Sequence, residues 1–235
     1  PPGTKTRMSL MLLATFALAA RVATDGISPE SNSKAPANAP NILIVSIDSA
    51  RNDHFGGEDS ITPSFDLLCE EGRRFTGAFS AIARTGPSHA GLMSGTGPWD
   101  AGFSLAKGQI PEQRSTVAER FQSEGYRTGA FVGSSLLSGG GGLARGFDVY
   151  DDDFSWLRGW QNSLFGKLES RLHPVQGSSR LGERTASSAL AWLQESSERP
   201  FFAWVQLSDP RFPYSPPPPW NTEYYLGDPR DPTHR

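Results

Sequence analysis

Two places in the sequence carry side chains whose types and spacing could support chemistry: Asp48, and the segment from Thr85 to His89. Thr85 comes just ahead of an expected short helix. The N–H groups after Pro87 and the partial positive charge of that helix start suit an oxyanion formed by attack on an ester. His89 could donate a hydrogen bond to the anion. Asp48 could hold a divalent metal ion, which would lower the pKa of the Thr85 hydroxyl and neutralise the ester oxygens.

Thr85 and His89 also have a structural explanation. A hydroxyl just ahead of a helix is more often an N-cap, which accepts a backbone hydrogen bond, than a nucleophile. A single histidine is likewise more often structural than catalytic. The residue types by themselves therefore leave the chemical and the structural interpretations of Thr85 and His89 both open.

The strand expected to position Asp48 is the run Ile-Leu-Ile-Val-Ser-Ile at residues 42–47. A continuous apolar and β-branched run is typical of a central parallel strand that is covered on both faces. Asp48 then stands at the C-terminal end of the strand, and open α/β sheets bind their ligands at that edge. The pattern favours a functional role for this carboxylate.

Beyond Asp48, segments with helical and strand patterns alternate. We expect helices over residues 63–71 after an N-cap at Thr62, and over 87–93, 115–123 and 184–193, with strands over 75–79, 126–132 and 201–205. This alternation predicts an α/β fold with a doubly wound, mostly parallel central sheet flanked by helices. Cys69 is expected to be a buried thiol of the core, and the glycines at 139–142 a mobile loop.

The first 39 residues are expected to lie outside the folded domain. Residues 1–24 combine Lys5 and Arg7 with an apolar run and small residues, which predicts a signal peptide or an upstream segment. Residues 25–39 form a polar, proline-containing linker. The apolar run is short for a bilayer, which needs about 20 apolar residues, so no stable membrane span is expected. These features predict a secreted or periplasmic protein, with an N-terminal membrane tether as the alternative.

Length and composition narrow the classes of function. A chain of 235 residues has room for one α/β domain with a sizeable core. The formal net charge of −3 gives no electrostatic footprint for nucleic acid. The single cysteine excludes an internal disulfide framework and a cysteine-rich zinc site.

Several segments resemble the sulfatase family in the order in which that family has them. They read PNILIVSID at 40–48, TPSFD at 62–66, EGRRFT at 71–76, TGPSHAGLMSG at 85–95, EGYRT at 124–128, RGFD at 145–148, PFFAWV at 200–205 and DPRFPY at 209–214. The resemblance is to the N-terminal region of the family, within the alkaline-phosphatase-like superfamily. It implies an alkaline-phosphatase-like fold in which residues 40–235 are the N-terminal part of a longer catalytic domain.

The resemblance also implies roles for single residues. Asp48 matches the first metal ligand of the family, and Ser49 stands where many sulfatases have a second aspartate. Thr85 stands at the cysteine that sulfatases oxidise to formylglycine, and His89 at an arginine. The implied cofactor is a divalent metal, calcium in sulfatases with zinc or manganese as alternatives. Asp48, Ser49 and Thr85 would hold it, together with ligands expected beyond Arg235.

Departures from the family pattern change the implied chemistry. Threonine cannot become the formylglycine aldehyde, so that cofactor is not expected. The Thr-x-Pro-Ser-His segment resembles a sulfatase-like subgroup, and phosphatases and phosphodiesterases of the superfamily use threonine or serine directly. Arg211 stands at a histidine position of the family. It could act as an anion clamp, being planar and always charged, or it could be a solvated loop residue.

The resemblance thus implies a metal-dependent hydrolase of sulfate or phosphate esters, with Thr85, His89 and Arg211 as catalytic residues. The substrate would be a small-molecule or glycan ester. A lysine and a histidine that clamp sulfate in the family are replaced by Gly133 and Ser135. Their loss keeps a second hypothesis open, a catalytically inactive relative that binds an anionic glycan or a protein partner.

Overall fold

A computed structural model describes residues 35, 38–56, 61–97, 109–155, 179–195, 197–211 and 220. Within these residues four strands form one sheet in the order β1-β4-β2-β3. Every pair of neighbouring strands is parallel. The strands are β1 (Ile42–Ile47), β2 (Arg127–Val132), β3 (Val149–Asp151) and β4 (Phe201–Leu207). The α-helices are α1 (Pro63–Glu71), α2 (Thr85–Ser94), α3 (Val117–Ser123) and α6 (Gly182–Gln194), and the short 3-10 helices are η1 (Asn52–His54), η2 (Ser135–Leu137) and η3 (Gly139–Gly141).

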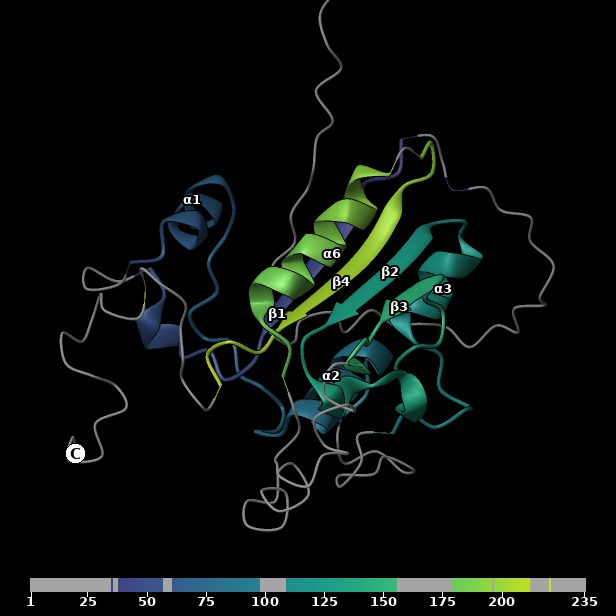
Figure 1. The fold of residues 1–235 in the computed structure, drawn as a ribbon, viewed down its shortest axis with the longest axis horizontal. Coiled ribbons are helices and arrows are strands. Elements are labelled where there is room, and N and C mark those ends of the chain that lie inside the picture. The colour runs from purple at the N-terminus through teal and green to yellow at the C-terminus, as the bar shows by residue number, and fades with distance from the viewer. Residues whose placement is uncertain are drawn as a thin grey trace, which may run out of the picture.

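Helices cover both faces of the sheet. Figure 1 shows α6 lying along one face, over β4 and β2. On β4, Ala203 and Val205 share a core cluster with α6, whereas Phe202 and Trp204 share the other cluster with α2 and α3. This division follows from the strand geometry, since successive side chains of a strand point to opposite faces. The predicted α/β fold with a doubly wound parallel sheet is confirmed.

The position of β1 in the sheet differs from the prediction. The strand forms and is parallel to its neighbour as expected, but among the described residues it pairs with β4 alone and is the outermost strand. Only Ile44 of its six residues is buried. An apolar run predicts that a strand can be covered on both faces, but it contains no information about which strands lie beside it.

Two smaller expectations are wrong. Residues 75–79 form no strand, and the side chains of Phe75 and Phe79 are exposed; none of the four described strands pairs with this segment. Cys69 is only half-buried, like the rest of α1, which has no buried residue. Within the loop expected at residues 139–142, Gly139–Gly141 forms a short 3-10 helix, and the N–H of Gly139 donates to Oδ2 of Asp152 at 3.0 Å; the mobility of this loop stays a prediction.

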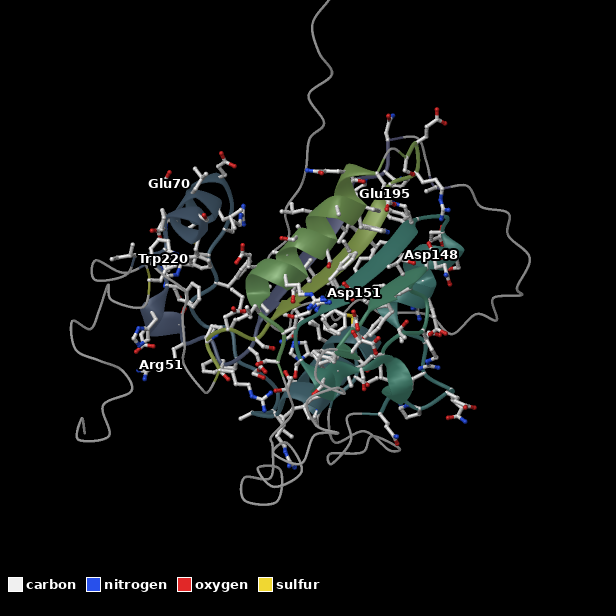
Figure 2. All side chains as sticks on the ribbon, viewed as in Figure 1. Arg51, Glu70, Asp148, Asp151, Glu195 and Trp220 are labelled. Atoms are coloured by element: carbon white, nitrogen blue, oxygen red, sulfur yellow. The ribbon has the colours of Figure 1, made fainter. Side chains whose placement is uncertain are left out.

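The helix α1 lies to one side of the sheet (Figure 1). It begins with Pro63 after an N-cap at Thr62 and ends before Gly72, as the sequence predicts. The hydroxyl of Thr62 makes no capping bond, and accepts instead from the N–H of Gly56 at 3.1 Å. Figure 2 shows Arg51 and Glu70 on this side, whereas Asp148 and Glu195 lie at the opposite, N-terminal edge of the sheet.

The segments predicted to precede the domain fall mostly outside the described residues. This holds for the expected signal peptide at 1–24 and for most of the expected linker at 25–39. In the part of the chain that the structure describes, no helix is long and apolar enough to cross a membrane.

The start of α3 gives a test of the fold. The hydroxyl of Thr116 accepts from the N–H of Glu119 at 3.0 Å and donates to the carbonyl of Arg145 at 2.9 Å, and the Glu119 side chain returns to the N–H of Thr116. We expect Thr116→Ala to lower the free energy of unfolding by about 1–2 kcal/mol, since a buried cap is lost. Thr116→Ser keeps the hydroxyl and should retain most of that stability. Urea unfolding measures both variants, and equal losses would contradict this account.

Candidate active site

The hydroxyl of Thr85 donates a hydrogen bond to Oδ2 of Asp48 over 2.8 Å. Asp48 directly follows β1, and its backbone N–H extends the pairing with β4 by donating to the carbonyl of Leu207 at 2.8 Å. Thr85 is the first residue of α2. The predicted proximity of the two side chains at the C-terminal end of β1 is therefore confirmed.

Arg211 approaches the same carboxylate from the turn that follows the neighbouring strand, β4. Its Nη1 lies 3.9 Å from Oδ2 of Asp48, and the side chains of Arg211 and Asp48 are only 15% and 13% exposed. Arg211 belongs to a turn after β4, in which its N–H donates to the carbonyl of Ser208 at 3.0 Å. Because β1 and β4 are parallel, the residues that follow them meet at one edge of the sheet. Arg211 is thus not a solvated loop residue.

The helix α2 begins two residues earlier than the sequence predicts. Thr85 lies in its first turn and Arg84 is the N-cap, so the hydroxyl of Thr85 is not a cap. The N–H of Ser88 donates to the carbonyl of Arg84 at 3.0 Å. The expectation that N–H groups after Pro87 face the Thr85 hydroxyl is therefore wrong, because the helix uses the first of them internally. Helix geometry leaves only the earliest N–H groups of the turn without an intrahelical acceptor.

His89 lies one turn further along α2 and is buried, with 7% of its surface exposed. Its Nδ1 lies 2.8 Å from the carbonyl oxygen of Thr85, and its Nε2 lies 3.1 Å from Oγ of Ser46. Burial lowers the pKa of His89, against the opposing effects of the bond to Thr85 and the charge of Asp48. The imidazole is therefore neutral near pH 7, and both of its nitrogens face protein atoms.

Ser49 follows Asp48 in a left-handed backbone conformation, with a φ of 59°. It is the one non-glycine residue with positive φ in the part of the chain that the structure describes. The conformation is costly for a residue with a Cβ, and such strain often accompanies functional sites. The side chain of Ser49 is exposed.

The expected metal ligands Asp48, Ser49 and Thr85 supply one carboxylate and two hydroxyl oxygens. Hard oxygen atoms of this kind suit calcium or manganese better than zinc. Calcium takes about six to eight oxygen ligands. Among the described residues, no group of three or more His, Cys, Asp or Glu side chains could hold a metal ion. The donor set fits a hard cation in kind, but it supplies only part of the ligands.

Two contacts that support the site have weak sequence signals. The hydroxyl of Ser46 also accepts from Nε1 of Trp204 at 3.0 Å. The one sequence feature that indicates this contact is a hydroxyl residue in an otherwise apolar strand. The Oδ1 atom of Asp209 accepts from the N–H of Gly182 at 2.9 Å, which fixes the turn before Arg211 to the start of α6. No local pattern predicts this bond, because its two partners lie far apart in the sequence.

Comparison with known proteins decides the family. The sequence model of the sulfatase family matches residues 40–235. The chain belongs to the sulfatase family. An ulvan-active sulfatase of Formosa agariphila is 28% identical over 205 residues, which cover 76% of this chain and 37% of that protein. Human arylsulfatase A is 32% identical over 104 residues, which cover 40% of this chain and 20% of that protein. This sulfatase-family chain therefore spans well under half the length of these relatives.

Solved structures agree on the fold. The phosphonate monoester hydrolase of Agrobacterium radiobacter superimposes with a TM-score of 0.57 at 22% identity, over 78% of this chain and 43% of that one. A protein of the alkaline phosphatase superfamily from Vibrio parahaemolyticus gives a TM-score of 0.53 at 19% identity, over 85% and 46% of the two chains. The expected alkaline-phosphatase-like fold is confirmed.

The contact between Asp209 and α6 predicts how the Arg211 turn is held. Asp209→Ala removes the acceptor for the N–H of Gly182, and should lower the free energy of unfolding by about 0.5–2 kcal/mol, the usual cost of losing a helix cap. Asp209→Asn retains an Oδ1 acceptor and should lose less. Guanidinium unfolding compares the pair. If both variants lost the same stability, the charge of Asp209 and not its hydrogen bond would matter.

Proposed function

We propose that this protein is a hydrolase of sulfate or phosphate esters in which Thr85 is the nucleophile. The observation that carries the proposal is the 2.8 Å hydrogen bond from Oγ1 of Thr85 to Oδ2 of Asp48. It directs a hydroxyl proton at a carboxylate, on the edge of the sheet where α/β proteins bind ligands. Membership of a family whose relatives are named sulfatases supports ester hydrolysis.

In the proposed reaction, Oγ1 of Thr85 attacks the sulfur or phosphorus atom of the ester. Its proton moves along the existing hydrogen bond to Asp48, which releases it to solvent, while the bond to the ester's alcohol oxygen breaks. That oxygen takes up a proton from solvent and leaves as the free alcohol, and a sulfated or phosphorylated threonine results. Water then hydrolyses this intermediate and restores the hydroxyl. Arg211, whose guanidinium lies 3.9 Å from Asp48, is proposed to bind the non-bridging oxygens, because a planar fork of donors matches such anions.

The proposal includes the dependence on a divalent metal that the resemblance to sulfatases implies. Asp48 and Thr85 would hold a divalent cation, with the hydroxyl of Ser49 as a third oxygen donor, and their hard oxygens favour calcium or manganese over zinc. When bound, the metal would lower the pKa of the Thr85 hydroxyl and neutralise charge on the ester.

Threonine at position 85 also favours phosphoesters over sulfate esters. The formylglycine route of sulfatases needs an aldehyde hydrate, which threonine cannot form. Direct attack needs only a hydroxyl of lowered pKa and a leaving group in line with it. We therefore infer that the protein belongs to a Thr-x-Pro-Ser-His subgroup without formylglycine. Its substrate would be a small-molecule or glycan ester outside the cytoplasm, where a signal peptide at residues 1–24 would direct it.

The nucleophile assignment is tested by replacing Thr85 in the full-length protein. Thr85→Ala should lower the turnover of p-nitrophenyl phosphate by several orders of magnitude, because the attacking oxygen is lost. Thr85→Ser keeps an oxygen in the same place and should retain most of the activity. Calcium binding, measured by calorimetry, should fall only partly in Thr85→Ala, and Asp48→Ala should abolish both binding and turnover.

Two outcomes would change the assignment. Full metal-dependent turnover by Thr85→Ala, purified free of contaminating phosphatase, would mean that Thr85 is not the nucleophile. A wild-type protein that binds inorganic phosphate or sulfate at this edge but turns over neither p-nitrophenyl phosphate nor p-nitrophenyl sulfate would favour the second hypothesis. In that case the protein would be an inactive relative that binds an anionic glycan or a protein partner.

Ser49 gives an independent test of the metal proposal. Ser49→Gly removes the hydroxyl and suits the positive φ, so calcium should bind more weakly while folding stability stays the same or rises. Ser49→Asp tolerates the same backbone conformation and adds the carboxylate that many sulfatases have, so calcium should bind more tightly. Calorimetry with calcium compares both with the wild type. Equal affinities would remove Ser49 from the set of ligands.

A further inference from the structure

Three polar side chains from three elements meet beneath the first turn of α2. They are Ser46 of β1, His89 of α2 and Trp204 of β4. Nε1 of Trp204 donates to Oγ of Ser46 at 3.0 Å, and the same oxygen lies 3.1 Å from Nε2 of His89. The far ring nitrogen of His89 lies 2.8 Å from the carbonyl oxygen of Thr85. The contacts form one continuous chain from β4 to the start of α2.

The direction of each hydrogen bond follows from the chemistry of its ends. A carbonyl oxygen only accepts, so Nδ1 of His89 must carry a hydrogen. An indole N–H only donates, so Ser46 accepts from Trp204. In the neutral ring with hydrogen on Nδ1, Nε2 can only accept, so the hydroxyl of Ser46 donates to it. In this arrangement every donor has one acceptor. The chain therefore specifies one ring orientation and one tautomer of His89.

Two members of the chain, His89 and Trp204, are buried, and Ser46 is partly buried, which makes the bonds between them costly to lose. Trp204 has no exposed surface, and the ring of His89 packs beside the indole with centroids 5.6 Å apart. Buried polar atoms that lose their partners carry the full cost of desolvation. A rotation of His89 toward an anion near the Thr85 hydroxyl would leave Ser46 and the carbonyl of Thr85 without these bonds. The geometry therefore disfavours His89 as a direct donor to the substrate.

Thr85 is instead held at two points by one face of one strand. Ser46 and Asp48 are two residues apart on β1 and its extension, so their side chains point to the same face. Asp48 accepts the hydroxyl hydrogen of Thr85 directly, and Ser46 reaches the carbonyl of Thr85 through His89. Two contacts at separated atoms fix both the position and the rotation of a residue, whereas one contact leaves it free to turn.

We propose that His89 and Ser46 are positioning residues, which hold the backbone of Thr85 so that its hydroxyl stays directed at Asp48. The inference rests on the proposed role of Thr85 as the nucleophile, and it replaces the expected role of His89 as an anion donor. Trp204 supports both residues, because its indole N–H donates to the hydroxyl of Ser46 and fixes its position.

The test compares Ser46→Ala with Ser46→Thr in the full-length protein. Ser46→Ala should lower kcat for p-nitrophenyl phosphate by about 10- to 100-fold with little change in KM, because the nucleophile is misplaced while the anion clamp remains. Ser46→Thr keeps the hydroxyl and should restore kcat. Assays are run well below the melting temperature of each variant. Wild-type kcat in a folded Ser46→Ala protein would overturn the proposal.

A second measurement does not depend on activity. Nitrogen-15 NMR of the wild type should show a neutral His89 with hydrogen on Nδ1 and none on Nε2, and inorganic phosphate should leave this unchanged. In Ser46→Ala, a crystal structure should place Oγ1 of Thr85 beyond hydrogen-bonding distance of Asp48. Hydrogen on Nε2 of the wild type would overturn the proposal even in an active enzyme. A protein without turnover but with the predicted tautomer and displacement would instead contradict only the proposed function.

Discussion

The parallel pairing of β1 with β4 is the constraint on which the candidate site depends. Parallel strands end at the same edge of the sheet, so Asp48 after β1 and Arg211 after β4 meet there, although they are far apart in the sequence. The pairing continues one residue past β1 through the N–H of Asp48, which fixes that backbone against β4. A shift of one residue in register would turn Ser46 and Asp48 to the opposite face of the sheet.

Packing on the α2 face of the sheet then places Thr85, the proposed nucleophile. Trp204 shares one cluster with Ala90 and Met93 of α2, which packs this helix against the sheet, and the bond from Thr85 to Asp48 places its first turn at the end of β1. Beside this cluster, Ser46 is hydrogen-bonded both to His89 and to the indole N–H of Trp204. A buried polar chain of this kind specifies one arrangement, because a displaced member would leave its neighbours unpaired. The same contacts that stabilise the core therefore also orient Thr85.

The charges at this edge of the sheet support the proposal of an anionic substrate. Asp48 is the acceptor for the Thr85 hydroxyl, and the guanidinium of Arg211 faces the same carboxylate. One negative and one positive group beside a hydroxyl can remove a proton and bind anionic oxygens at the same place. A neutral His89 adds no charge, since its burial lowers its pKa. The geometry thus separates the residues that contact the substrate in our proposal from those that position them.

The sequence by itself determined the α/β fold and the sulfatase family and singled out Asp48 and Thr85 as candidates, because apolar periodicity and contiguous motifs are local properties. It could not determine that β1 would pair only with β4 in the described sheet, or that residues 75–79 would form no strand, since strand pairing depends on distant segments. The tertiary structure alone decided the contacts of His89, Ser46 and Asp209. Their partners are side chains or backbone groups whose proximity arises from packing, and an isolated histidine or serine contains no information about which atom it will face in the folded protein.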